Sequence, residues 1–422
     1  MTQSGKNAGW KVTLAGTGIN LALGVLYTWS VISKAIPAEW GWSESARSLP
    51  YSVACVVFAL MTIPAGWMQD KIGPKWVAFL GGILCGLGLM LASRSMNVGL
   101  FVVGFGILAG SGIGLGYAAA TPPAVKWFPP QRTGLIAGIV VAGFGLASVY
   151  ISPLANYLIS TVGVQQSLMI FGVAFLIVVT SLSLILKNPP AGYKPEAAPA
   201  KTMTNGGTAA AAAVAVNYSW TEMLKTPQFY LLWLMYAFAA GAGLMIIAKL
   251  AKIVDVQAGV KAGFAFVALL AIGNAGGRVI AGFFSDKIGR TRTMLMVFLF
   301  QAVLIFTLRA VTSAGAFTII SMLLGFNYGA NLSLFPSITK DFYGLKNFGV
   351  NYGFVFTAWG VGGTILSYIS GRVYDNAVAA AKAAGLPPVG NFYQAYTIAG
   401  FLLLVAAALS FLVKTPAAMP KK

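Results

Sequence analysis

Long apolar runs, repeated along the whole chain, constrain this sequence more than any other feature. A membrane-spanning helix needs about 20 predominantly apolar residues, and runs near that length alternate here with short clusters of Pro, charged, Asn, Ser and Gly residues. They fall near residues 12–33, 48–68, 76–93, 99–121, 134–158, 167–186, 228–249, 262–284, 293–312, 315–335, 348–371 and 393–413. The sequence therefore predicts an all-α membrane protein with twelve transmembrane helices.

The composition supports this class and excludes several others. The 422 residues are 58% hydrophobic and only 9% charged, whereas a soluble domain carries roughly 25% charged residues. With no His and only Cys55 and Cys85 as cysteines, the chain lacks a His general base, a His metal ligand and a Cys-x-x-Cys pair. We therefore expect no enzyme activity, no metal and no cofactor.

The distribution of basic residues predicts the orientation. The chain has 28 Lys and Arg against 9 Asp and Glu, a net charge of +19. With the twelve spans above, the side that holds both termini carries twice as many basic residues as the other, and cytoplasmic loops are the basic ones. We expect a multi-pass inner-membrane protein with both termini cytoplasmic. The first apolar run is expected to stay in the protein as a membrane span and not to be removed as a signal peptide. The charge then reflects topology and implies no nucleic-acid partner.

A polar stretch divides the spans into two sets of six. Residues 187–227 contain Asn188-Pro189-Pro190, a Gly pair and an Ala run, a composition typical of a flexible linker. We expect an N-terminal six-helix bundle at 1–186, a cytoplasmic linker at 187–227 with a short surface helix at 219–225, and a C-terminal bundle at 228–422.

The two predicted bundles share one motif. It follows the second span of each set, as GWMQDKIGPK from residue 66 and as GFFSDKIGRTR from residue 282, with an offset of 286 − 70 = 216 residues. Glycine allows helices to approach, and the Asp can interact with a neighbouring helix N-terminus. A single copy would indicate only a charged turn, but two copies at matching places indicate an internal repeat. The predicted gating and structural residues are Gly66, Asp70, Lys71, Gly73, Gly282, Asp286, Lys287, Gly289 and Arg290.

This repeat resembles the hallmark motif of the major facilitator superfamily. Four further segments, KWFPPQRTGL at 126–135, MLKTPQF at 223–229, LFPS at 334–337 and NYGF at 351–354, resemble the branch that contains oxalate/formate antiporters and monocarboxylate transporters. The resemblance implies two pseudo-symmetric six-helix bundles, a substrate site near the bilayer midplane between them, and alternating access.

One basic residue, Arg278, falls inside a predicted span. An Arg at that depth costs about 2.5–3.5 kcal/mol on insertion scales, and all nine acids lie in loops or at span ends. An anionic substrate would supply the missing charge, and Asn274 lies one helical turn earlier on the same face. The alternative is an Arg whose side chain extends to the cytoplasmic edge.

The resemblance also implies which charges the site lacks. Oxalate/formate antiporters have a Lys where this chain has Trp359, while animal monocarboxylate transporters have a Lys in the region of residues 24–29 and an Asp at the position of Asn274. A single Arg matches a single carboxylate. By resemblance, the cavity is lined by Leu26, Tyr27, Tyr117, Tyr328, Phe356 and Trp359, although each aromatic ring could equally serve helix packing.

These observations predict a monomeric secondary transporter of small monocarboxylates such as lactate or pyruvate. Proton-coupled symport is the expected mode, with Arg278 binding the carboxylate and the proton accompanying the anion, since neither a His nor a buried acid is expected. Two alternatives stay open: a carboxylate antiporter of the oxalate/formate type, and a membrane sensor that has lost transport.

Overall fold

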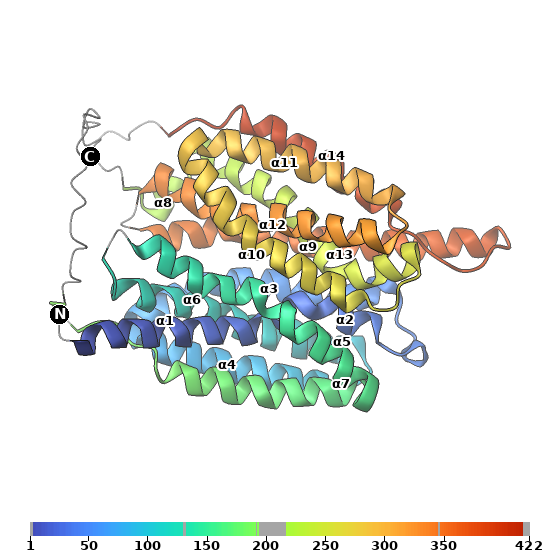
Figure 1. Cartoon of the computed structure of the whole chain (residues 1–422), viewed down its shortest axis with the longest axis horizontal. Helices are drawn as coiled ribbons and strands as arrows, with labels where there is room; N and C mark the ends of the chain where they lie inside the picture. The colour runs from blue at the N-terminus through green and yellow to red at the C-terminus, as the bar shows by residue number, and fades with distance from the viewer. Residues whose placement is uncertain (1–2, 130–131, 191, 194–216, 345–346, 417–422) are drawn as a thin grey trace.

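The computed structural model describes residues 3–129, 132–190, 192–193, 217–344 and 347–416 as a bundle of long helices (Figure 1). No strand occurs within these ranges. Among the described residues, eleven helices are long and apolar enough to cross a membrane. We call residues 1–186 the first half and residues 228–422 the second half; they lie below and above the middle of Figure 1 respectively.

The described part of the first half consists of long α-helices joined by short 3-10 and π-helical segments. In chain order they are α1 (Gln3–Leu23), the 3-10 helix η1 (Gly24–Thr28), α2 (Trp29–Lys34), the 3-10 helix η2 (Ala38–Trp40), α3 (Glu44–Ile72), α4 (Pro74–Ala92), α5 (Val98–Phe101), the π-helix η3 (Val102–Ala109), α6 (Gly110–Lys126) and α7 (Thr133–Ser183).

The linker end and the second half follow the same helical pattern. Their elements are α8 (Trp220–Met223), α9 (Pro227–Ala258), α10 (Gly263–Ile288), α11 (Arg290–Thr307), the 3-10 helix η5 (Leu308–Ala310), α12 (Ala314–Tyr343), α13 (Phe348–Ala383) and α14 (Tyr393–Ser410).

A glycine reconciles the eleven long helices with the twelve expected spans. Helix α7 has 51 residues, and Gly163 inside it has φ 78° and ψ 172°, a backbone conformation that only glycine adopts readily. The chain reverses there, so α7 contains two spans. The fold is thus the expected all-α membrane architecture with twelve crossings.

The repeated motif forms the same turn in both halves. Gly73 separates α3 from α4 with φ 83° and ψ 161°, and Gly289 separates α10 from α11 with φ 95° and ψ 152°. Positive φ suits glycine at both positions. The two halves are therefore alike in conformation at the motif as well as in sequence.

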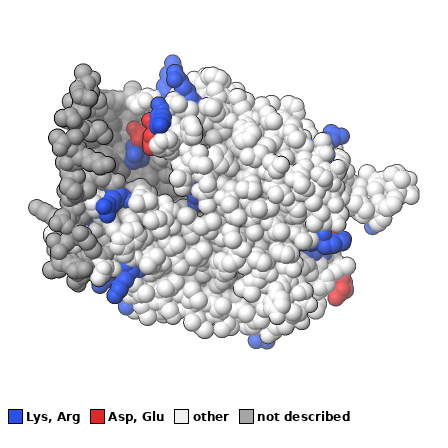
Figure 2. All heavy atoms as spheres, viewed as in Figure 1, with Lys and Arg blue, Asp and Glu red and all other residues white. Residues whose placement is uncertain are grey.

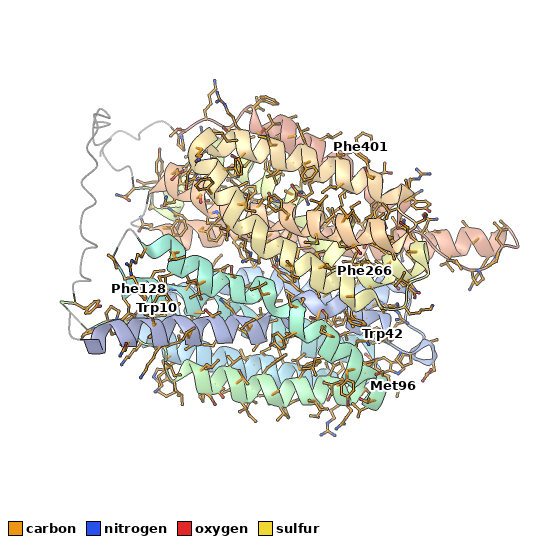
Figure 3. The ribbon with its side chains drawn as sticks, in the orientation of Figure 1. Trp10, Trp42, Met96, Phe128, Phe266 and Phe401 are labelled. Carbon is orange, nitrogen blue, oxygen red and sulfur yellow. The ribbon has the colours of Figure 1, made fainter. Side chains whose placement is uncertain are left out.

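The start of the first helix and the end of the last one lie toward the same end of the bundle. Helix α1 begins and α14 ends at the left of Figure 1; we call this the terminal end and the opposite one the far end. Most charged side chains visible in Figure 2 lie toward these ends, and the broad middle carries few. Trp10 and Phe128 are near the terminal end, and Trp42 and Met96 near the far end (Figure 3). The uncharged middle is the surface expected to face lipid.

Several helices are longer than the expected spans, and α9 and α13 correct the loops predicted after them. Helix α9 continues beyond residue 249 to Ala258, and α13 continues beyond residue 371 to Ala383 and projects past the far end in Figure 1. Hydropathy marks only the part of a helix that is apolar. Polar residues at a helix end continue the backbone hydrogen bonds without extending the apolar run.

The predicted linker is described only in part. Residues 194–216 lie outside the described residues. After them, α8 begins with a capping box in which Ser219 and Glu222 bond to each other's backbone N–H groups. The backbone N–H of Tyr218 donates to the Tyr343 carbonyl at 3.0 Å, and the Asn351 side chain donates to the Tyr218 carbonyl at 3.0 Å. These bonds fasten the start of α8 to α12 and α13.

Candidate functional site

Arg278 lies between the two halves and contacts both. Its Nε donates to Asn274 Oδ1 at 3.1 Å within α10, and an Nη atom donates to the backbone carbonyl of Val141 in α7 at 3.1 Å. No ion pair joins it to a carboxylate among the described residues. The guanidinium is therefore held in place by two neutral oxygens, and its charge has no protein counter-ion in the described chain.

Asn274 presents an unused donor beside that charge. The residue is fully buried, and its Nδ2 has no hydrogen-bond partner among the described atoms. Helix α12 packs tightly behind it, since a Cβ added at Gly329 would lie 2.0 Å from the Asn274 carbonyl oxygen. A buried amide without a partner costs free energy. Asn274 and Arg278 together thus offer donors for an anion, and we call them the clamp.

Gly145 of α7 faces the clamp from the first half, and the sequence analysis missed it. A Cβ at this position would lie 3.4 Å from Asn274 Nδ2 and 3.5 Å from Arg278 Nε. Gly145 is one helical turn after Val141. This face of α7 therefore presents the Val141 carbonyl oxygen to the clamp, and no side chain of residue 145 fills the space beside it. Its signal in the sequence was weak, because it is one of 50 glycines.

A hydrogen-bonded chain links Tyr27, Tyr328 and Trp359 across the halves. The hydroxyls of Tyr27 and Tyr328 are 2.6 Å apart, and Trp359 Nε1 donates to the Tyr328 hydroxyl at 2.8 Å. One hydroxyl donates to the other, so only one of the two hydroxyl hydrogens is used between them. The other hydrogen has no acceptor among the hydrogen bonds of the described residues.

Aromatic rings surround the hydrogen-bonded side chains of Tyr27, Tyr328 and Trp359. Tyr117 of α6 lies within electrostatic range of Arg278, and its ring stacks with that of Phe356 at 6.3 Å between centroids. Phe58 contacts Tyr117, Phe144, Phe356 and Trp359, with centroids 5.1–5.7 Å apart. Phe58 and Phe144 were not predicted, although the repeat held a signal for Phe58: 274 − 216 = 58, so Phe58 is the first-half counterpart of Asn274.

The remaining predicted residues are Leu26 and the residues of the two motif copies. Leu26 is buried in η1, next to Tyr27. In the second motif copy, Arg290 pairs with Asp286 at 2.6 Å and with Asp341 of α12 at 2.9 Å, and Lys287 lies over the ring of Phe283.

The first motif copy differs in its contacts. Lys71 Nζ lies 3.9 Å from the centroid of the Trp67 ring, and the Asp70 side chain lies outside the described residues. The motif glycines do not create the close helix approach that was expected. Nothing lies within 4 Å of a Cβ built at Gly66, and the nearest atom to one at Gly282 is 3.9 Å away.

The expectation that no acid would be buried was wrong. Glu44, the first residue of α3, is buried against Lys249 of α9, which is the last residue of the predicted span 228–249. Glu44 begins α3, as the sequence indicated, whereas Lys249 lies inside α9, nine residues before its end at Ala258. The two side chains meet where the two halves close on each other. Burial of this acid therefore comes from tertiary packing.

A separate hollow of about 140 Å³ lies at the far end of the interface. Lys34 and Lys261 line it, and both pair with Asp255, at 3.3 and 2.9 Å. None of the predicted site residues lines this hollow. We place the candidate site at the clamp, because its guanidinium contacts both halves and has no carboxylate partner among the described residues, whereas each lysine of the hollow is paired with Asp255.

These features define a class of protein. A multi-pass helical bundle with a charge held between two similar halves is the architecture of a secondary membrane transporter. The chain belongs to the Major Facilitator Superfamily, whose family model matches residues 14–367 and 258–422. It is therefore a transporter of that superfamily.

Known proteins similar to the chain agree with this assignment. The MFS-type transporter YhjX of Escherichia coli strain K12 is 31% identical, over 83% of this chain and 85% of its own length. The oxalate:formate antiporter of Oxalobacter formigenes is 30% identical, over 79% and 77%. Monocarboxylate transporter 13 of Rattus norvegicus is 24% identical, over 94% and 87%.

Among solved structures, a bacterial homologue of the human lysosomal transporter Spinster superposes with a TM-score of 0.70 at 18% identity. The match covers 98% of this chain and 97% of that one. At this identity the likeness concerns the fold alone.

Proposed function

We propose that this protein transports small monocarboxylates, with the carboxylate bound at the clamp. The observation that carries the proposal is the single guanidinium of Arg278, which lies between the halves without a protein carboxylate among the described residues. A guanidinium binds a carboxylate through paired N–H groups, and Asn274 Nδ2 adds a further donor.

The number of available cations favours a singly charged substrate. Trp359 occupies the position where oxalate/formate antiporters, by resemblance, carry a second cation, and its Nε1 is engaged with Tyr328. Lys249, the other buried cation of the interface, is neutralised by Glu44. A dianion at the clamp would leave one charge uncompensated in a medium of low dielectric constant, which is unfavourable.

The surrounding groups suit a short substrate such as lactate or pyruvate. Aromatic rings bound the apolar end of such a ligand, and the spare hydroxyl hydrogen of the Tyr27–Tyr328 pair can donate to its 2-hydroxy or 2-oxo oxygen. As the mode of transport we propose symport of the anion with a proton across the inner membrane, by a monomer with cytoplasmic termini.

Uptake of labelled lactate into proteoliposomes tests this function. We expect an inward proton gradient to accelerate uptake, and Arg278→Lys to reduce uptake by about tenfold or more, since a Lys cannot form the paired contacts of a guanidinium. Full transport by Arg278→Lys would contradict binding at the clamp.

Anion exchange is the second candidate, because the Oxalobacter formigenes relative is named an oxalate:formate antiporter. The same vesicles distinguish it from symport. Uptake that ignores the proton gradient but requires unlabelled carboxylate inside the vesicles would establish exchange in place of symport.

A further inference from the structure

Besides the Lys34–Asp255 pair, three charged side chains join the two halves at the far end. Lys249 Nζ of α9 lies 2.7 Å from Glu44 Oε1 of α3 and donates to the Glu44 carbonyl oxygen at 3.2 Å. The two side chains are only 1% and 7% exposed. We call Glu44, Lys249 and Asp375 the far-end ion cluster.

Asp375 joins the cluster from a third helix. Its carboxylate belongs to α13 and accepts the backbone N–H groups of Glu44 at 2.8 Å and Ser45 at 2.9 Å. The first N–H groups of a helix have no partner within that helix and attract negative charge. The start of α3, in the first half, is therefore capped by a carboxylate of the second half.

The contact between α3 and α13 continues inward from the cluster. A Cβ added at Gly371 would lie 2.7 Å from the Glu44 carbonyl oxygen, and Thr364 donates to the Ser52 carbonyl at 2.7 Å. Further inward, a Cβ at Gly360 would lie 2.8 Å from the Cys55 carbonyl oxygen. This part of the interface is closed, and it opens only if α3 separates from α9 and α13.

Separation of the halves changes the surroundings of each charge. In the closed form Glu44 and Lys249 are excluded from water and depend on each other, since a buried charge without its partner is strongly unfavourable. In a form open at the far end both side chains reach water, where a single charge is well solvated. Removal of one partner therefore penalises the closed form and leaves the open form nearly unaffected.

We propose that the far-end ion cluster sets the balance between closed and open states of the far end. Glu44, Lys249 and Asp375 are positioning residues in the transport cycle: they do not touch the substrate, and they determine how readily this end admits it. The proposal is independent of which anion is carried and of whether a proton accompanies it.

The native cysteines provide a measurement of far-end opening. Cys55 is fully buried in α3 at the interface, eleven residues after Glu44. Cys85 is equally buried, but inside the first half, where its backbone packs against Gly112 of α6. The experiment uses the full-length protein in lipid nanodiscs, N-ethylmaleimide as the probe, and mass spectrometry of the two cysteine peptides.

We expect Glu44→Gln and Lys249→Gln each to raise the labelling rate of Cys55 by about tenfold or more, as loss of one member of a buried pair implies. Asp375→Asn should act in the same direction with a smaller increase. The double variant E44Q/K249Q should label more slowly than either single variant, because it leaves no unpaired charge. Cys85 should stay protected throughout.

The control is Lys261→Gln, which removes a far-end cation that is 86% exposed. Its partner Asp255 keeps the ion pair with Lys34 of the first half, so the substitution leaves no buried charge unpaired. The Cys55 labelling of this variant should match that of the unmodified protein. Unchanged labelling in both single variants would overturn the proposal, as would increases that simply add in the double variant. Loss of Cys85 protection along with that of Cys55 would also overturn it. The Glu44–Lys249 pair would then stabilise the whole fold and not specifically the closed far end.

Discussion

At the scale of single residues, the clamp depends on the uncharged amide of Asn274, because a carboxylate at this position would neutralise Arg278. Asn274 Oδ1 accepts a hydrogen bond from Arg278 Nε, and its Nδ2 has no partner among the described atoms, so the residue orients the guanidinium without neutralising it. A carboxylate in the same place would orient the guanidinium equally well but would compete with the substrate for its charge. The uncharged side chain is what leaves Arg278 available.

Asn274→Asp tests this point. We expect carboxylate binding to weaken by about tenfold or more near neutral pH, a loss of roughly 1.4 kcal/mol. Binding should recover as the pH falls, because protonation of the new carboxyl frees Arg278. Isothermal titration at several pH values measures both effects. Asn274→Ala, which removes the amide without adding charge, is the control and should bind with no added pH dependence; the same pH profile for both variants would exclude Asn274 from the site.

At the scale of secondary-structure elements, the reversal inside α7 rests on one residue. Gly163, with φ 78° and ψ 172°, connects two spans of the first half without a loop of other residues. Any side chain strains this conformation, at a cost of about 1–3 kcal/mol. The fold of α7, and with it the placement of Val141 and Gly145 against α10, depends on that turn.

Gly163→Ala should therefore lower the free energy of unfolding by about 1–3 kcal/mol, seen as an earlier thermal transition of the purified protein. Gly138→Ala, in a regular helical part of α7 with nothing within 4 Å of the added Cβ, is the matched control. It should leave stability unchanged or raise it by about 0.5–1 kcal/mol, since Ala favours a helix over Gly. Equal effects of the two substitutions on stability would contradict the argument that the backbone conformation at residue 163 requires glycine.

At the scale of the whole molecule, the candidate site is made by the contact between the halves. Arg278 and Tyr328 belong to the second half, while their partners Val141 and Tyr27 belong to the first. A ligand bound there contacts both halves, and binding to the folded form alone stabilises a protein by about 2.7 kcal/mol at 100 times the dissociation constant. The thermal stability of the complete chain should therefore rise when a substrate binds.

A panel of short carboxylates makes this measurable. We expect lactate and pyruvate to raise the melting temperature of the purified protein, and oxalate or succinate to give little shift at the same concentration, because the clamp holds one positive charge. Arg278→Lys should abolish the shifts. Stabilisation by the dicarboxylates at least as large as that by the monocarboxylates would reject the charge argument.

Local sequence patterns determined much of this protein. Apolar runs located the spans, the motif copies at Gly73 and Gly289 indicated two similar halves, and the lone charge in an apolar run singled out Arg278. These features are local, because burial of a helix in lipid depends on its own composition and a positive φ on the residue that adopts it. The long α9 and α13 were less predictable, since polar helix ends carry no hydropathy signal.

Only the tertiary structure decided which distant residues meet. Glu44 and Lys249 are 205 positions apart and Arg278 and Val141 are 137 apart, and nothing near either residue in the sequence specifies its partner. Such contacts follow from how the helices of the two halves pack, which depends on all side chains along an interface at once. Hence the sequence alone determined the membrane fold and the isolated charge, whereas packing decided that Gly145 faces this charge and that a buried ion pair closes the far end.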